Sequence, residues 1–221
     1  MLKYQLDNLV PIYCRNIRKI RLNFAFQRGT FETSNSTPIY SLREVAANYI
    51  ELGLSVTPVK FKGKNPIIPG WQKLTIGKKN VDNWFGPEPT NIGVLLGTPS
   101  GGLVDIDLDD NDAVELATAF LPPTNMVFGR TSRPSSHRLY RVPDPGKPRK
   151  LAASGLGSII ELRSTGQQTV FPGSIHDSGE PITFEMDGEP AEVTWNGALS
   201  KSHLPPCCAN DGKTAIAMTW L

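Results

Sequence analysis

The chain has 221 residues, of which 39% are hydrophobic and 20% are charged, so it can bury one sizeable core and is not a globally disordered protein. Its formal net charge of +2 hides an asymmetry, because residues 1–40 contain six Lys/Arg and two Asp/Glu, whereas the remaining residues contain 17 and 19. The body of the chain is near neutral, so any binding of nucleic acid must come from local basic patches and not from bulk charge.

Cysteine usage and hydropathy bear on where the protein works. The three cysteines, Cys14, Cys207 and Cys208, are too few and too badly spaced for a disulfide framework, which favours a reducing, cytoplasmic location. No apolar run approaches the length of a membrane span, and the N-terminus lacks the apolar stretch of a signal peptide. We therefore expect no membrane partner.

Residues 1–40 differ in pattern from the rest of the chain. Basic and apolar residues alternate in RNIRKIRLNFAFQR, and the polar stretch ETSNSTP is typical of a linker. We expect a basic leader and linker outside the fold, and a domain that begins at Ser41.

Helices and strands alternate in the first half of this domain. The segment SLREVAANYIELG has a capping box in Ser41 and Glu44, apolar residues at helical spacing and a terminal Gly53, which together predict a helix. Short apolar runs bounded by Gly, Pro and Asn then predict three elements: a strand at 55–59, a short helix at 81–85 and a strand at 91–97. The five-residue connection 98–102 predicts a hairpin between that last strand and the apolar run 103–109.

The second half is mostly strands. Residues 111–121 have a helical composition, and Pro122 and Pro123 end the helix. Five apolar runs separated by Pro, Gly and Ser predict strands at 125–130, 137–142, 158–163, 168–173 and 181–185. A mixture of helices and strands followed by antiparallel strands predicts an α+β domain over 41–197, with 198–221 as an unassigned tail.

The run LVDIDLD brings two carboxylates to one face of a predicted strand. Its apolar residues enter a core, while Asp105 and Asp107 project together from the other face. Two carboxylates on one rigid edge suit Mg²⁺ or Mn²⁺, and two such ions can serve an in-line displacement at phosphorus. The same letters also fit a core strand that runs into an acidic turn, where Asp109 or Asp110 caps the next helix.

Other candidate residues have side chains that can bind phosphate or metal. Alternate residues of a strand share a face, so a pair spaced by two can act together. Imidazole nitrogens and an Arg fork can hold phosphate oxygens, and a lysine in a Gly/Pro-rich loop can steer them. Each also has an ordinary explanation as a solvated surface residue. The candidates are the pairs Ser135 and His137, Glu161 and Arg163, Ser174 and His176, and the loop residue Lys64.

Taken in order, these segments resemble the bifunctional DNA primase-polymerases of bacteria, phages and plasmids, within the archaeo-eukaryotic primase superfamily. The resemblance covers roughly residues 41–184 and depends on the order of ELGLSVTPV, GKNPIIPGW, NIGVLLGTPSGGLVDIDLD, SSHRLYRV and IIELRSTGQQTVFPGSIHDSG. It implies an RNA-recognition-motif-like, mostly antiparallel catalytic sheet with an N-terminal α/β unit. It also implies template-directed nucleotidyl transfer with Mg²⁺ or Mn²⁺.

The resemblance assigns roles to individual positions. The first motif of the family falls on Asp105 and Asp107, the second on Ser135 and His137, and the third acid on Glu161, where many relatives carry Asp. Asp105, Asp107 and Glu161 would then be the catalytic, metal-binding acids. The expected nucleotide-binding residues are Ser135, His137, Arg163, Ser174, His176 and Lys64. The implied partners are a single-stranded DNA template, an NTP or dNTP, and a helicase encoded separately.

Two other functions stay open at this point. One is a catalytically silent, single-stranded nucleic-acid-binding remnant of a mobile element. The other is a metal-dependent nucleotide-sugar transferase, which would explain the Asp pair but gives no reason for the strands of His137 and Glu161. A calcium loop is excluded, because counting from Asp105 places Asp110 where Gly is needed and Leu116 where Glu is needed.

Overall fold

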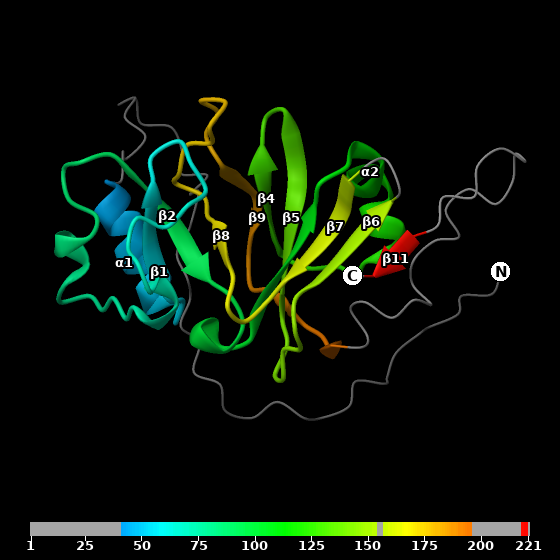
Figure 1. The fold of residues 1–221 in the computed structure, drawn as a ribbon, viewed down its shortest axis with the longest axis horizontal. Helices are drawn as coiled ribbons and strands as arrows, with labels where there is room; N and C mark the ends of the chain where they lie inside the picture. The colour runs from blue at the N-terminus through cyan, green and yellow to red at the C-terminus, as the bar shows by residue number, and fades with distance from the viewer. Residues whose placement is uncertain (1–40, 154–156, 196–217, 221) are drawn as a thin grey trace, which may run out of the picture. The chain divides into compact units, whose positions relative to one another are not determined.

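The computed structural model of the protein describes residues 41–153, 157–195 and 218–220 (Figure 1). The leader and linker predicted at 1–40, and the predicted tail except 218–220, lie outside the described residues. Within the described ranges two α-helices accompany two mostly antiparallel sheets, which confirms the predicted α+β class. None of the helices there is both long and apolar enough to cross a bilayer.

The first helix, α1 (Leu42–Glu51), begins and ends as its sequence predicts. The Ser41 hydroxyl accepts from the backbone N–H of Glu44 at 3.3 Å, and the Glu44 carboxylate accepts from the Ser41 N–H at 2.7 Å. Both bonds satisfy amides that a helix start leaves without partners. At the other end the chain turns at Gly53, whose φ is +77°. The buried face of α1 contains Ala46 and Tyr49.

This helix packs on a small sheet with the strand order β1-β2-β8. Strands β1 (Val56–Lys60) and β2 (Thr90–Leu95) pair antiparallel, with Val56 opposite Val94. The third strand, β8 (Gln168–Val170), comes from much later in the chain and pairs antiparallel with β2. The small sheet therefore combines the start of the domain with the segment that comes after Glu161 and Arg163.

The larger sheet has the strand order β11-β6-β7-β3-β5-β4-β9, and β10 pairs with β5. Strand β3 (Leu103–Leu108) lies between β5 (Arg133–Arg141) and β7 (Gly157–Arg163), antiparallel to both. The other strands are β4 (Met126–Arg130), β6 (Arg149–Ala153), β9 (Thr183–Asp187), β10 (Ala191–Glu192) and β11 (Met218–Trp220). The sequence patterns did not predict β6, β10 or β11.

Side-chain parity along β3 agrees with the sequence. Val104 and Ile106 belong to the core cluster that contains Ala113 and Ala117 of α2 (Asn111–Phe120). Leu103, on the opposite parity, belongs to the other cluster, with α1 and the small sheet. The two faces of β3 thus have different neighbours, and its aspartates lie on the face turned towards the small sheet.

The hairpin predicted across residues 98–102 is wrong. Strands β2 and β3 lie in different sheets, and a single isolated bridge joins Gly97 to Leu103. The connection contains the short 3₁₀ helix η3 (Thr98–Ser100), and the buried Ser100 hydroxyl donates to the Leu95 carbonyl at 2.5 Å. Left-handed glycines flank this turn, so the chain leaves one sheet and enters the other instead of folding back on itself.

Two glycines with similar positive φ angles allow a test of this connection. Gly102 has φ +82°, and a Cβ there would collide with the Val142 carbonyl oxygen, whereas Gly53 has φ +77° and open space. Each Gly→Ala change should cost about 1–2 kcal/mol of unfolding free energy from the left-handed backbone. Gly102→Ala should cost about 1–3 kcal/mol more from the steric clash. Urea unfolding measures both, and equal losses would contradict the close approach.

Candidate functional site

A cavity of about 490 Å³ lies where the two sheets face each other. Its walls come from β3, β4, β5 and β7 of the larger sheet, from β8 and the turn after it, and from the loop after β1. Six of the nine predicted site residues line it: Asp107, Glu161, His137, Arg163, His176 and Lys64. Asp105, Ser135 and Ser174 are not among the lining residues.

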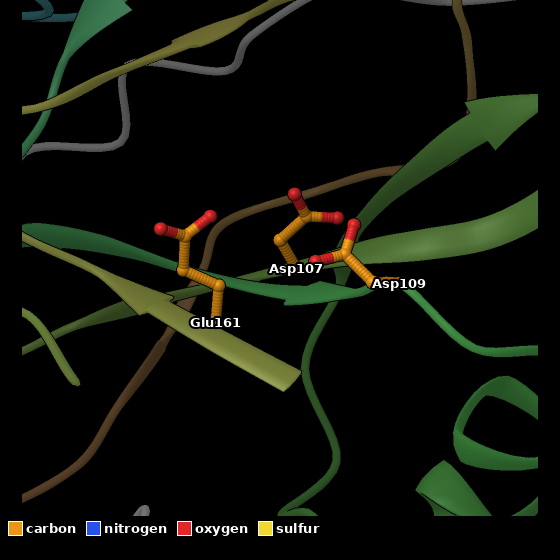
Figure 2. Close-up of side chains that lie close together, drawn as sticks. All are labelled: Asp107, Asp109 and Glu161. Carbon is orange, nitrogen blue, oxygen red and sulfur yellow. The ribbon is translucent and has the colours of Figure 1, made fainter. Parts of the chain in front are cut away.

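Three carboxylates converge on one wall of this cavity. Oxygens of Asp107, Asp109 and Glu161 all lie within 4.8 Å of one another. In Figure 2 all three side chains project to the same side of the sheet, from β3 and its end and from β7. The β3–β7 register explains the first contact, since it places Asp107 directly opposite Glu161. Asp109 joins them because its backbone N–H donates to the Ile159 carbonyl and so stays beside β7.

Asp109 was not among the predicted site residues. The sequence offered it only as a possible helix cap, but Asp110 is the cap of α2 and accepts from the Asp112 N–H at 2.9 Å. The information that could have found Asp109 is its parity, since residues 105, 107 and 109 alternate along one face when the strand is extended by one residue.

Arg163 counters the charge of this cluster. Its guanidinium forms ion pairs with Asp107 and, at 3.0 Å, with Glu161. Burial lowers the pKa of Arg163, but the charges of Asp107, Asp105 and Glu161 raise it well above its ordinary value. Burial raises the pKa of Asp107. The charges of His137 and Arg163 lower it, but the pKa stays above its ordinary value. The three carboxyl groups of the cluster outnumber the one guanidinium, and such an excess of acidic groups is favourable for a divalent cation.

Asp105 lies deeper than the other acids and is fully buried. One carboxylate oxygen, Oδ2, accepts from the Thr169 hydroxyl at 2.6 Å and lies 3.0 Å from Nδ1 of His137. The other, Oδ1, has no hydrogen-bond partner among the residues that the structure describes. Burial raises the pKa of Asp105, but His137, Arg163 and Thr169 together lower it below its ordinary value. The carboxylate is therefore ionised, with one oxygen held and one unpartnered.

His137 is fixed between these aspartates. It lies on β5, opposite Asp107 of β3. Its Nδ1 is 3.0 Å from Asp105 Oδ2 and 3.7 Å from Asp107 Oδ1. The ring stacks on Phe128, with centroids 4.6 Å apart. Burial lowers the pKa of His137, but the charges of Asp105 and Asp107 raise it above its ordinary value. Because the acids engage Nδ1, Nε2 is the nitrogen left for a ligand.

The strand alternation expected for Ser135 and His137 fails. Ser135 has φ +54°, and the β4–β5 register shifts between Phe128 and Arg130. Such a bulge changes the direction of the neighbouring side chains, and the buried Ser136 lines the cavity beside His137. Gly129 makes room for the bulge, since a Cβ there would collide with the Arg133 carbonyl oxygen.

The two predicted site residues in the turn after β8, Ser174 and His176, have different surroundings. Ser174 is buried, and its hydroxyl accepts from the Ile92 N–H at 2.9 Å, so it fastens the turn to β2. His176 lines the cavity, and its Nδ1 lies 2.7 Å from Asp177. Burial and the charge of Arg130 lower the pKa of His176 below its ordinary value.

Thr169 is a second site residue that the sequence patterns did not predict. This β8 residue is buried and carries the hydroxyl that donates to Asp105, so it links the small sheet to the acids of the larger one. A threonine inside a short apolar strand has no distinguishing pattern, and only the tertiary contact of the two sheets reveals its part in the site.

Comparison with protein families finds a relationship over most of the described chain. The family model of the bifunctional DNA primase/polymerase N-terminal domain, Prim-Pol, matches residues 46–195. No curated protein matches the chain. The matched segment covers more than half of the sequence and includes every residue of the cavity wall. The chain therefore belongs to the Prim-Pol family of bifunctional DNA primase/polymerase N-terminal domains.

Proposed function

We propose that the protein adds nucleotides to a DNA strand on a single-stranded template, as a primase, a polymerase or both, by a mechanism with two metal ions. Family membership supports a DNA primase/polymerase. The observation that carries the proposal is the convergence of Asp107, Asp109 and Glu161 on a cavity wall beside His137 and Arg163. Acids that bind a cation, next to groups that bind phosphate, are what nucleotidyl transfer requires.

The residues present fit Mg²⁺ or Mn²⁺. The donor set of Asp107, Asp109 and Glu161 consists of oxygens alone, which hard divalent cations prefer. Asp105 adds a buried oxygen without a partner, the atom that a nearby cation would satisfy. When bound, such cations neutralise phosphate charge and lower the pKa of the attacking hydroxyl.

The other cavity residues hold and orient the nucleotide in this proposal. The guanidinium of Arg163 is paired with Asp107 and Glu161, and its remaining N–H groups can donate to a triphosphate oxygen. The contact between Asp105 and Nδ1 fixes the His137 ring, so Nε2 can donate to a phosphate oxygen. Lys64 and His176 line the cavity as well, and add donors for the phosphate chain. Ser174 supports the cavity through its hydroxyl, which fastens the turn after β8 to β2, and Ser135 does so through the bulge in β5.

A role in replicating a phage, plasmid or other mobile element, a separate helicase partner and a cytoplasmic location remain part of the proposal. No specific observation favours either of the two alternative functions, the silent nucleic-acid-binding remnant or the nucleotide-sugar transferase. A silent remnant needs no cluster of three acids, and a sugar transferase gives no role to the buried pair of Asp105 and His137.

Nucleotide incorporation tests the function directly. Labelled dNTPs and NTPs are supplied with primed and unprimed single-stranded DNA, with Mg²⁺ or Mn²⁺. We expect incorporation by the wild type, and a loss of at least roughly a hundredfold, about 2.7 kcal/mol of barrier, in Asp107→Asn and in Glu161→Gln. Glu192→Gln, at an exposed position on β10, is the control and should keep full activity. A wild type inactive under every condition would overturn the proposal.

Cation binding by Asp109 can be measured without catalysis. Asp109→Asn should weaken Mn²⁺ binding roughly tenfold, because the site loses one charged ligand. Electron paramagnetic resonance of free Mn²⁺ during titration gives the affinity. Asp112→Asn removes a nearby exposed charge on α2 and serves as the control. Equal Mn²⁺ affinity in the two variants would exclude Asp109 from the cation site.

Measuring nucleotide KM and Mn²⁺ affinity in one variant distinguishes the role of His137 from that of the acids. His137→Ala should raise the nucleotide KM roughly tenfold, since one donor to the phosphates is lost, while the affinity for Mn²⁺ changes less. Steady-state incorporation and Mn²⁺ titration of the same preparation give both values. An unchanged KM would show that His137 only supports the strand.

A further inference from the structure

The loop 60–71, which consists of the last residue of β1 and the segment that follows it, presents an aromatic ring among lysines. Phe61 is 39% exposed, and Nζ of Lys62 lies 5.7 Å from the centroid of its ring. The loop also exposes Ile67, at 51%. Exposed aromatic rings set among cations are typical of surfaces that bind single-stranded nucleic acid, because bases stack on the rings while phosphates meet the charges.

The positive charge of this surface is not compensated. Residues 52–81 contain six lysines and no acidic residue. Lys78 pairs with Glu51 of α1, but among the described residues no carboxylate lies within ion-pair distance of Lys60, Lys62 or Lys64. In a chain whose formal net charge is only +2, such a segment is a local basic patch of the kind that phosphates require.

The loop is held in place by its backbone. It extends the β1 edge, with a bridge between Val59 and Pro66 and a hydrogen bond from the Lys60 N–H to the Asn65 carbonyl at 3.0 Å. From the small sheet, the Gln168 amide donates to the Lys64 carbonyl at 2.8 Å. A ring on an ordered loop loses less conformational entropy on stacking than a ring on a mobile one.

The same loop borders the cavity. Gly63, Lys64, Asn65 and Pro66 line the cavity wall, whereas Phe61 and Lys62 do not. One side of the loop thus faces the proposed nucleotide site, and the ring lies only two residues from the lining residue Gly63. A template strand that leaves the cavity has this surface beside it.

We infer that the loop 60–71 grips the single-stranded template, with Phe61 stacking on a base and Lys60 and Lys62 contacting phosphates. The inference rests on the proposed function, since it names where the template of that reaction is held. It adds a contact outside the cavity. Phe61 and Lys62 do not line the cavity that contains the acids and the proposed phosphate-binding residues, so their loss should affect template binding and leave chemistry at saturating template unchanged.

Binding of a fluorescein-labelled single-stranded oligothymidine, measured by anisotropy without nucleotide or metal, tests the ring. Phe61→Ala should weaken binding roughly tenfold, the usual cost of losing one base–aromatic stack. Leu116→Ala, which removes an exposed aliphatic side chain from α2, is the control and should bind like the wild type. Binding of a duplex of the same length should not change in Phe61→Ala, because paired bases cannot stack on the ring.

The salt dependence of the same binding tests the lysines. Lys62→Gln should flatten the slope of log K against log salt by about 0.7, the value for one phosphate contact on a single strand. Lys147→Gln, an exposed lysine that does not line the cavity, should leave the slope unchanged. Unchanged affinity and slope in Phe61→Ala and Lys62→Gln would overturn the inference.

Incorporation on a primed template separates this inference from the proposed function. If the loop variants bind the oligothymidine like the wild type and the wild type incorporates nucleotide, the template grip is wrong and the proposed function holds. If the wild type incorporates nothing under any condition, the proposed function fails, and the inference fails with it. With both correct, Phe61→Ala raises the KM for template and keeps kcat.

Discussion

The fold depends on how it accommodates negative charge in the middle of a sheet. Asp105 and Asp107 lie on the central strand β3, one fully buried and the other 6% exposed. Buried carboxylates are costly unless they are paired and hydrogen-bonded. His137 from β5 and Arg163 from β7 provide the opposite charge from the two neighbouring strands. The antiparallel order β7-β3-β5 is what brings both cations to the aspartates.

The small sheet takes part in this arrangement. Thr169 of β8 donates to Asp105 at 2.6 Å and accepts from Arg163 at 3.4 Å, so one hydroxyl from the small sheet contacts both an acid and a cation of the charged group. The site therefore forms only when the two sheets come together. Strand β8 comes after β7 in the chain, separated from it by a short turn, which keeps Arg163 and Thr169 close in space.

Local chemistry made much of this predictable from sequence. The capping box of α1, the parity of LVDIDLD and the spacing of Glu161 and Arg163 each depend on residues close together in the chain, and the structure agrees with all three. The failures have tertiary causes. The connection 98–102 resembles a hairpin loop, yet its direction is set by left-handed glycines and by Ser100 bonded to Leu95. The periodicity of apolar residues along the sequence does not show where the chain passes from one sheet to another.

Tertiary structure also explains the differences between the predicted and the observed lining of the cavity. A bulge at Ser135, which Gly129 accommodates, exchanges Ser135 for Ser136 on the cavity wall. Asp109 joins the acids because its N–H remains bonded to β7 beyond the last ladder residue. Both effects depend on how a strand ends or bends beside its neighbour. Alternation gives the face of a strand, but register and bulges decide which residues reach the cavity. The acids gather where the ladder between β3 and β7 ends, and there they line the cavity.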